Sequence, residues 1–285
     1  MGEQEKKRIE FNSKAEFVKY LENKADNHRN YKFYGSKKVI MNMCETHSVY
    51  LSDGNNWNDE EDKTNMQNDE FYHHFAICFS FSISENVAMW MLYSKDNGCI
   101  IDFDKNAIQE IKNKSIVEIG FFKEDGSFDS IQTLSVKEND IRFQLFDIVY
   151  YGEPENIDLV GKKYYFKRSN DVEKEFDKKF LDCCKFYRKK LPWFYENECR
   201  LVVSIRRDLI DHDIPGLRLK ISIDESNISR LRNVKRIINS PNAKNVLIDG
   251  FYSKNTESKL AGRINWNLKD QFCDGCEYKK IEGKN

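Results

Sequence analysis

The stretch that decides the fold is His74–Ile83, which reads HFAICFSFSI. It is rich in aromatic residues and isoleucine, which favour extended strands. Phe79 and Phe81 alternate with Ser80 and Ser82, so the two kinds of side chain face opposite sides of the strand. The segment therefore predicts a strand within a sheet, whose serine side either faces solvent or lines a polar cleft.

Further strand patterns lie on both sides of this stretch. They cover residues 48–52, 98–104, 116–122, 148–151, 199–205, 217–223 and 234–238. Capping-box patterns predict helices opening at Ser13 and Ser82, a third helix is expected from Lys37, and Ser240-Pro241 looks like another helix start. Strands and helices do not alternate regularly. The predicted fold class is therefore α+β, with a mixed or antiparallel β-sheet core and several flanking helices.

Two segments each have an excess of charge of one sign. Asp53–Glu70 has seven acids and one lysine and is predicted to be an acidic loop. Asp171–Lys190 is predicted to be one long helix, because its apolar residues recur at helical spacing. The stretch Lys162–Lys190 holds eleven basic and five acidic residues, so it could dock a nucleic acid or act as a solvated helix face. We regard the solvated face as the better interpretation.

Composition removes several classes of protein. The chain has 285 residues and a formal net charge of −1, which argues against a polycationic nucleic-acid binder. We expect a single α+β domain over residues 1–267, followed by a polar C-terminal tail over 268–285. No apolar run is long enough for a transmembrane helix and no signal peptide is visible, so we expect a cytoplasmic protein without membrane contact.

Cysteines and known motifs give little support to a metal or phosphate site. The eight cysteines are expected to be reduced. Cys273-x-x-Cys276 is half of a zinc pattern, so structural or incidental thiols are the favoured interpretation and no metal ligand is assigned. Phosphate-binding glycine loops, the zinc-protease motif and the hydrolase nucleophile motif are all absent from the sequence.

Glu196-Asn197-Glu198 is the most interesting pair of carboxylates. On an extended segment the two glutamates point the same way, and their repulsion raises the pKa of one of them. Such a pair can stabilise a cationic sugar transition state or activate a hydroxyl. The alternative is a solvated strand end with Glu198 paired to Arg200 or a nearby lysine.

Six clusters follow one another along the chain: Tyr31-Lys32-Phe33-Tyr34, Trp57-Asn58-Asp59, Cys78-Phe79-Ser80, Met89-Trp90-Met91-Leu92-Tyr93, Gly98–Asp104 and Lys189–Arg200. Together they resemble the bacterial family known as domain of unknown function 2971. Their order and spacing are similar to those of the family over residues 31 to 245.

A second resemblance is to the Arg-Ser-Glu layout of ADP-ribosyltransferases. It implies an ADP-ribosyltransferase-like fold with NAD as the substrate cofactor. The implied catalytic residues are Glu198 at the ribose, Glu196 at the acceptor, and Ser80, which would steady either the nicotinamide-side ribose or the second glutamate. The implied cofactor-binding residues are Lys32 at a phosphate, and Tyr34, Trp57 or Tyr93 stacked on nicotinamide or adenine. The sequence has Lys32 where that layout has arginine, and a lysine cannot form the bidentate fork.

The expected function is therefore an NAD-dependent ADP-ribosyltransferase, a bacterial toxin or anti-phage effector that modifies a nucleic acid or protein. The alternative is a non-enzymatic nucleotide- or protein-binding sensor module. A metal-dependent nuclease or other hydrolase using Asp59, Asp102 or Glu198 has no carboxylate cluster at metal-ligand spacing to support it.

Overall fold

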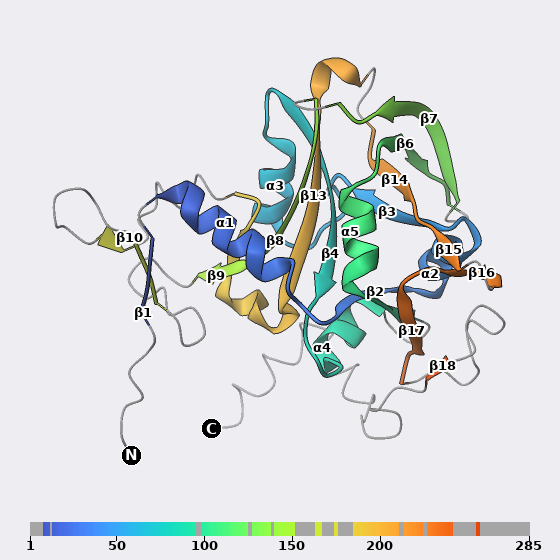
Figure 1. Cartoon of the computed structure of the whole chain (residues 1–285), viewed down its shortest axis with the longest axis horizontal. Helices are drawn as coiled ribbons and strands as arrows, with labels where there is room; N and C mark the ends of the chain where they lie inside the picture. The colour runs from blue at the N-terminus through green and yellow to red at the C-terminus, as the bar shows by residue number, and fades with distance from the viewer. Residues whose placement is uncertain are drawn as a thin grey trace, which may run out of the picture.

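The structure of the chain is a computed structural model (Figure 1). It describes residues 8–11, 13–94, 98–124, 127–137, 140–151, 163–166, 174–175, 185–210, 214–224, 227–241 and 255–256. Helices and mostly antiparallel strands mix along the chain, which confirms the α+β class. The Cys273–Cys276 pair, the tail 268–285 and residues 242–254 lie outside the described residues.

An eleven-stranded sheet forms the centre of the fold. Its order is β18-β17-β5-β2-β4-β3-β14-β6-β7, and β13 joins β4 to β8. The strands are β2 (Tyr31–Ser36), β3 (Ser48–Ser52), β4 (Tyr72–Ser80), β5 (Gly98–Phe103), β6 (Ile116–Phe122), β7 (Phe128–Ser135), β8 (Ile141–Asp147), β13 (Glu198–Arg206), β14 (Gly216–Lys220), β17 (Val234–Asn239) and β18 (Asn255–Thr256). All neighbours run antiparallel except β17 and β18.

Three smaller sheets accompany the central one. They contain β1 (Arg8–Phe11) with β10 (Lys163–Phe166) and β11 (Lys174–Glu175), β9 (Val149–Tyr151) with β12 (Arg188–Lys190), and β15 (Ile223–Asp224) with β16 (Asn227–Leu231). The predicted strand at 148–151 is β9, and the other strand patterns coincide with strands of the central sheet. The strand patterns do not include β2, β7, β8 or β18, and in β7 the side chains are mostly exposed and polar.

The stretch that predicted a strand forms most of β4, which is fully paired with β13. Nine residue pairs join the two strands, from Ser80 opposite Glu198 to Tyr72 opposite Arg206. Neither face of β4 is open to solvent: Phe79 belongs to the main hydrophobic core, and Ser80 is only 1% exposed. The strand signal is strong because both faces are covered.

The helices are α1 (Lys14–Ala25), α2 (Lys37–Glu45), α3 (Glu60–Gln67), α4 (Val87–Met89) and α5 (Lys105–Lys112), with a π-helical turn at Trp90–Ser94 and 3-10 turns at Leu191–Glu196 and Arg207–Leu209. The predicted cap of α1 is confirmed, because the backbone N–H of Glu16 donates to Ser13 Oγ at 3.2 Å. No described helix is long and apolar enough to span a bilayer.

The predicted helix start at Ser82 is wrong. Asn86 caps α4 instead, since its Oδ1 accepts from the N–H of Ala88 at 2.9 Å. The Glu85 carboxylate, which the capping-box pattern places on the backbone, accepts from the Trp90 indole N–H at 3.1 Å. A tertiary partner has thus replaced the local one.

The prediction of an acidic loop over Asp53–Glu70 is also wrong in part, because α3 lies within this segment. Asp59 Oδ1 accepts from the N–H of Glu61 at 3.0 Å and caps the helix, and Asp62 is buried. Acidic residues in the first turn stabilise a helix N-terminus. The acids that indicated a solvated loop therefore include a helix cap and a buried side chain.

The long helix expected over Asp171–Lys190 is contradicted wherever the structure describes that segment. Residues 174–175 form β11, and residues 188–190 form β12, which pairs in parallel with β9. Strand pairing therefore overrides the helical spacing of the apolar residues there. The remainder, residues 171–173 and 176–184, lies outside the described residues.

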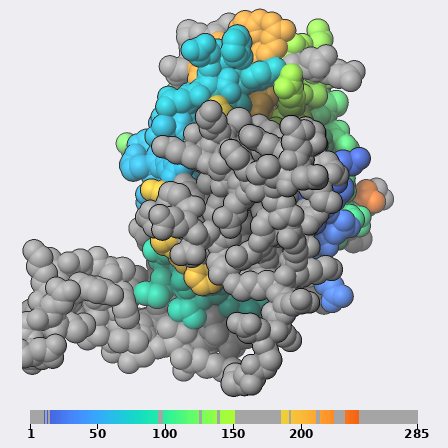
Figure 2. Space-filling model, turned by 90° about the vertical axis from the view of Figure 1, so that its left-hand side faces the viewer, coloured from blue at the N-terminus to red at the C-terminus, as the bar shows by residue number. Residues whose placement is uncertain are grey.

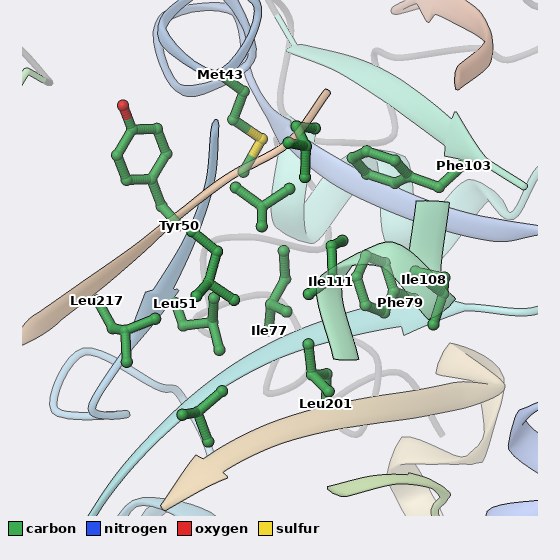
Figure 3. Close-up of a cluster of buried hydrophobic side chains, with 14 of the residues drawn as sticks. Met43, Tyr50, Leu51, Ile77, Phe79, Phe103, Ile108, Ile111, Leu201 and Leu217 are labelled. Atoms are coloured by element: carbon green, nitrogen blue, oxygen red, sulfur yellow. The ribbon is translucent and has the colours of Figure 1, made fainter. Parts of the chain in front are cut away.

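The main hydrophobic core lies between the central sheet, α2 and α5 (Figure 3). Ile108 and Ile111 of α5 are fully buried within it, in the same cluster as Phe79 and Leu201 of the paired central strands. A second cluster, which includes Phe17 and Leu21 of α1, covers the other side of β13.

The sheet divides at β4, and this division positions the candidate site. Because β13 pairs with β4 along its whole length, β2 and β3 must share the opposite edge of β4. Each touches it at one point, β2 at Ser80 and β3 at Ala76. These contacts are four residues apart, roughly 13 Å along a strand. A fork therefore opens between β2 and β3, and α2 connects their ends.

Candidate functional site

A cavity of about 450 Å³ occupies this fork. The lining residues from β2, α2, β3 and β4 are Phe33, Tyr34, Val39, Met43, Tyr50, Leu51, Ser52, Ala76, Ile77, Cys78 and Phe79. The remainder of the lining consists of Asn56, Trp57, Asn58, Asp59, Asp62, Met89, Tyr93, Phe122, Lys189, Trp193, Glu196, Glu198 and Arg200. One wall is thus mostly apolar and the other is charged, which is the usual character of a small-molecule site.

The segments that supply the charged wall meet on one side of the molecule. In Figure 2, gold side chains from the region near residue 190 reach the surface between cyan side chains near residue 60 and teal side chains near residue 90. The charged wall therefore combines α3, the π-helical turn and the 3-10 turn before β13.

Arg200 is the centre of the charged wall. Its two terminal nitrogens donate to the two oxygens of Asp62 at 2.8 and 2.7 Å, and its Nε donates to Glu198 Oε1 at 2.6 Å. The guanidinium also lies 4.8 Å from the ring centre of Trp57. All three charged side chains are at most 3% exposed, so solvent screens their interactions weakly.

Lys189 joins the second glutamate to this network. Its ammonium donates to Glu196 Oε2 at 2.6 Å and to Glu198 Oε2 at 3.4 Å, and it lies 3.5 Å from Asp62. It is placed 4.8 Å over the ring of Trp193. Two cations and three carboxylates therefore share one buried wall.

The two glutamates do not lie on one extended segment, as the sequence analysis assumed. Glu196 ends a 3-10 turn and Glu198 begins β13. Asn197 between them is left-handed, with φ of 44°. This conformation suits asparagine better than most residues. Asn86 and Asn197 both donate to the Tyr195 carbonyl, and these hydrogen bonds fix the turn.

The environment separates the pKa values of the two carboxyl groups. Burial, followed by the charge of Glu198, raises the pKa of Glu196 to about 7, against the opposing effect of Lys189. Burial also acts to raise the pKa of Glu198, but Arg200 and Lys189 outweigh it and hold that pKa well below its usual range. Glu198 is thus ionised, and Glu196 is the group that can exchange a proton near neutral pH.

Tyr93 connects the π-helical turn to Glu196. Its hydroxyl donates to Glu196 Oε1. Burial, and then the charge of Glu196, raise the Tyr93 pKa well above its ordinary value, so the hydroxyl stays a donor. Single π-helical turns occur frequently at functional sites, because they displace a side chain from its regular helical position.

Five of the seven site residues expected from the sequence line the cavity. They are Glu196, Glu198, Tyr34, Trp57 and Tyr93. The lining does not include Ser80 or Lys32.

Ser80 and Lys32 nevertheless lie in one row with Glu198. Ser80 pairs in register with Glu198 on one side and with Lys32 on the other. The Lys32 ammonium donates to the carbonyls of residues 82, 83 and 84 at 2.6, 2.8 and 3.1 Å, so it holds the loop after β4.

The sequence analysis missed three charged members of the site as functional residues. Asp62 was assigned to a loop, and Lys189 was assigned to a helix. Arg200 was considered only as a surface partner of Glu198, and that pairing is present although it is buried. A basic residue two positions after Glu198, on the same face of the strand, was the available signal.

Comparison with known proteins adds a family but no activity. Residues 89–201 match the model of a family of proteins of unknown function. This segment belongs to the family DUF2971. The family expected from the motifs is thereby confirmed over residues 89–201 of the expected 31 to 245. This DUF2971 segment runs from Met89 of α4 to Leu201 of β13 and includes both glutamates. No curated protein and no solved structure matches the chain.

The charged wall of the DUF2971 segment is suited to proton transfer and electrostatic stabilisation. The raised pKa of Glu196 allows it to exchange a proton near neutral pH, Tyr93 donates a hydrogen bond to it, and Glu198 contributes negative charge beside the cavity. Asp62 comes from outside the DUF2971 segment and completes the network through Arg200.

Proposed function

We propose that the cavity binds a nucleotide-type substrate and that the protein is an NAD-dependent ADP-ribosyltransferase-like enzyme. The observation that carries the proposal is the convergence of Glu196 and Glu198 on one wall of an aromatic-lined cavity. Cleavage of the bond between ribose and nicotinamide generates positive charge on the sugar, and a nearby carboxylate stabilises that charge. The volume of about 450 Å³ is typical of small-molecule sites.

Glu196 and Glu198 take different parts in this proposal. Glu198 has a lowered pKa and accepts hydrogen bonds from Arg200 and Lys189, so it acts electrostatically as a carboxylate. Glu196 is the acid–base group, because its pKa of about 7 favours proton transfer to or from an acceptor at neutral pH. Tyr34, Trp57 and Tyr93 supply aromatic surface for the nicotinamide or adenine ring.

The acceptor in this proposal is a nucleic acid or a protein, as for a toxin or an anti-phage effector. Ser80 remains part of the proposal because it lies directly opposite Glu198 in the pairing of β4 with β13. Lys32 acts through the loop after β4 rather than at a phosphate, since its ammonium already donates to three carbonyls of that loop.

A non-enzymatic binding module is the second candidate. The observation that favours it is that both oxygens of the Glu198 carboxylate already accept hydrogen bonds, one from Arg200 and one from Lys189. A nucleotide or small ligand would then bind the aromatic wall without being converted.

Nicotinamide release from NAD separates the two candidates. Wild-type protein should release nicotinamide in the presence of candidate acceptors, and Glu196→Gln and Glu198→Gln should each reduce the rate at least a hundredfold. Glu118→Gln is the matched control, because Glu118 is ion-paired to Arg218 and lies outside the cavity lining. NAD binding without release in the wild type would support the binding module. Absence of both binding and release would refute the NAD proposal.

A further inference from the structure

A second cluster of side chains lies on the opposite face of β13 from Glu198. Cys199 is opposite Asp147 in the register of β13 and β8, so the two side chains share a face. His28, in the turn after α1, reaches the same point, and its Nε2 is 2.5 Å from Asp147 Oδ1. One ligand-type atom from each residue lies within 4.8 Å of the other two.

We propose that His28, Asp147 and Cys199 form a binding site for a divalent transition-metal ion, zinc above all. An imidazole nitrogen, a carboxylate oxygen and a sulfur are the donors that zinc takes in proteins, and three protein ligands leave a fourth position for water or another ligand. Within the described part of the chain, this is the one set of three such donors that converges.

The dimensions fit zinc after small side-chain movements. Bond lengths of about 2.0–2.3 Å place neighbouring ligands of a tetrahedral zinc roughly 3.3–3.7 Å apart. The hydrogen-bonded His28–Asp147 pair must therefore open by about 1 Å, and a pair at the 4.8 Å limit would have to close by about 1 Å. Both changes require only side-chain rotation, since Cys199 and Asp147 already share one ladder position.

Lys24 shows that the site already holds a positive charge. Its ammonium lies 2.9 Å from Asp147 Oδ2, and its side chain is 36% exposed while Asp147 is 1% exposed. Lys24 can therefore swing into solvent when a metal takes its place. His28 is 15% exposed, which gives the ion a path from solvent to a buried carboxylate.

The phenyl ring of Phe81 orients the imidazole. The two rings stack with centroids 4.0 Å apart and planes 6° from parallel. Stacking fixes the plane of the imidazole ring, and its Nε2 faces Asp147. Fixed ligand orientation by neighbouring side chains is a regular feature of metal sites in proteins.

Zinc titration of the full-length, chelator-treated protein tests the proposal, with a chromophoric competitor for affinity and cobalt as a spectroscopic substitute. We expect one zinc per chain in the wild type and in a Cys273→Ser/Cys276→Ser double variant. A thiolate-to-cobalt charge-transfer band should be present in both. Cys199→Ser and His28→Gln should each weaken zinc binding at least tenfold. Lys24→Gln should strengthen it about tenfold, because it removes the competing cation.

Cys44→Ser is the matched cysteine control, since Cys44 is equally buried and lies outside the cluster. His28→Gln affects a partly exposed turn residue, so it remains informative if Cys199→Ser does not fold. The proposal is overturned by equal zinc affinity in the wild type and His28→Gln, by loss of zinc in the Cys273→Ser/Cys276→Ser variant, or by no zinc binding in either wild type or Lys24→Gln.

Discussion

Arg200 should be the most costly side chain to remove from the candidate site. Arg200→Met keeps an apolar stem of similar length but removes the guanidinium that serves both Asp62 and Glu198. These two carboxylates are 2% and 3% exposed, so neither can recover its solvation by moving a short distance. Breaking a buried ion pair from one side costs about 3–5 kcal/mol of unfolding free energy.

The expected loss for Arg200→Met is therefore about 3–5 kcal/mol, a large share of the roughly 5–15 kcal/mol that stabilises a typical domain. Lys189 stays within 3.4 Å of Glu198 and 3.5 Å of Asp62, so it limits the loss at both carboxylates without replacing the guanidinium. Urea unfolding followed by tryptophan fluorescence measures the difference, and Trp57 beside Arg200 reports directly on the site.

Arg206→Met provides the matched control, because Arg206 is on the same strand and pairs with Asp208 and Asp140 at the surface. Its unfolding midpoint should hardly change, since exposed ion pairs contribute little. The double variant Asp62→Leu/Arg200→Met should recover more than about 1 kcal/mol relative to Arg200→Met, because it removes the unpaired carboxylate. A loss below about 1 kcal/mol for Arg200→Met, or an equal loss for Arg206→Met, would refute the reasoning.

Three further predictions concern the site and its support. The rate of nicotinamide release should follow an ionisation near pH 7, because burial raises the pKa of Glu196 to about 7, and Glu196→Gln should abolish that dependence. Burial lowers the pKa of His74 to about 4, so the unfolding free energy should fall by up to roughly 3 kcal/mol between pH 6.5 and 4, and less in His74→Asn, as measured by urea unfolding at several pH values. Gly98→Ala should lower the melting temperature and nicotinamide release together, because a Cβ there would overlap the Ser94 carbonyl and displace the π-helical turn.

Much of the fold could be predicted because its strands are covered on both sides. β4 and β13 are buried along nearly their whole length, and their centres hold the unbroken apolar runs Phe75–Phe79 and Leu201–Val203. β7 escaped prediction for the opposite reason, since it lies at the edge of the sheet with mostly exposed side chains. The cap at Ser13 could be predicted because its hydrogen bond is local in the sequence. The cap expected at Ser82 is absent because the Glu85 carboxylate accepts a hydrogen bond from the Trp90 side chain instead.

The candidate site was predictable only where its residues are close in the sequence. Glu196 and Glu198 were found from their spacing. Asp62 could not be connected with Arg200, because 138 residues separate them and only the fold brings α3 against β13. The same limit applies to His28 and Asp147, which are 119 residues apart.

The composition of the buried network explains why Glu196 is the group that titrates. Asp62, Glu196 and Glu198 would carry three negative charges against the two positive charges of Lys189 and Arg200. A net charge in a buried wall is costly, so one carboxylate accepts a proton more readily than it would in water. Glu198 touches both cations and Asp62 has the bidentate arginine, whereas Glu196 has Lys189 and a neutral hydroxyl. The proton therefore belongs to Glu196. Positive charge that develops on a substrate in the cavity would favour loss of this proton from Glu196. Proton transfer would thereby be coupled to the chemistry that we propose.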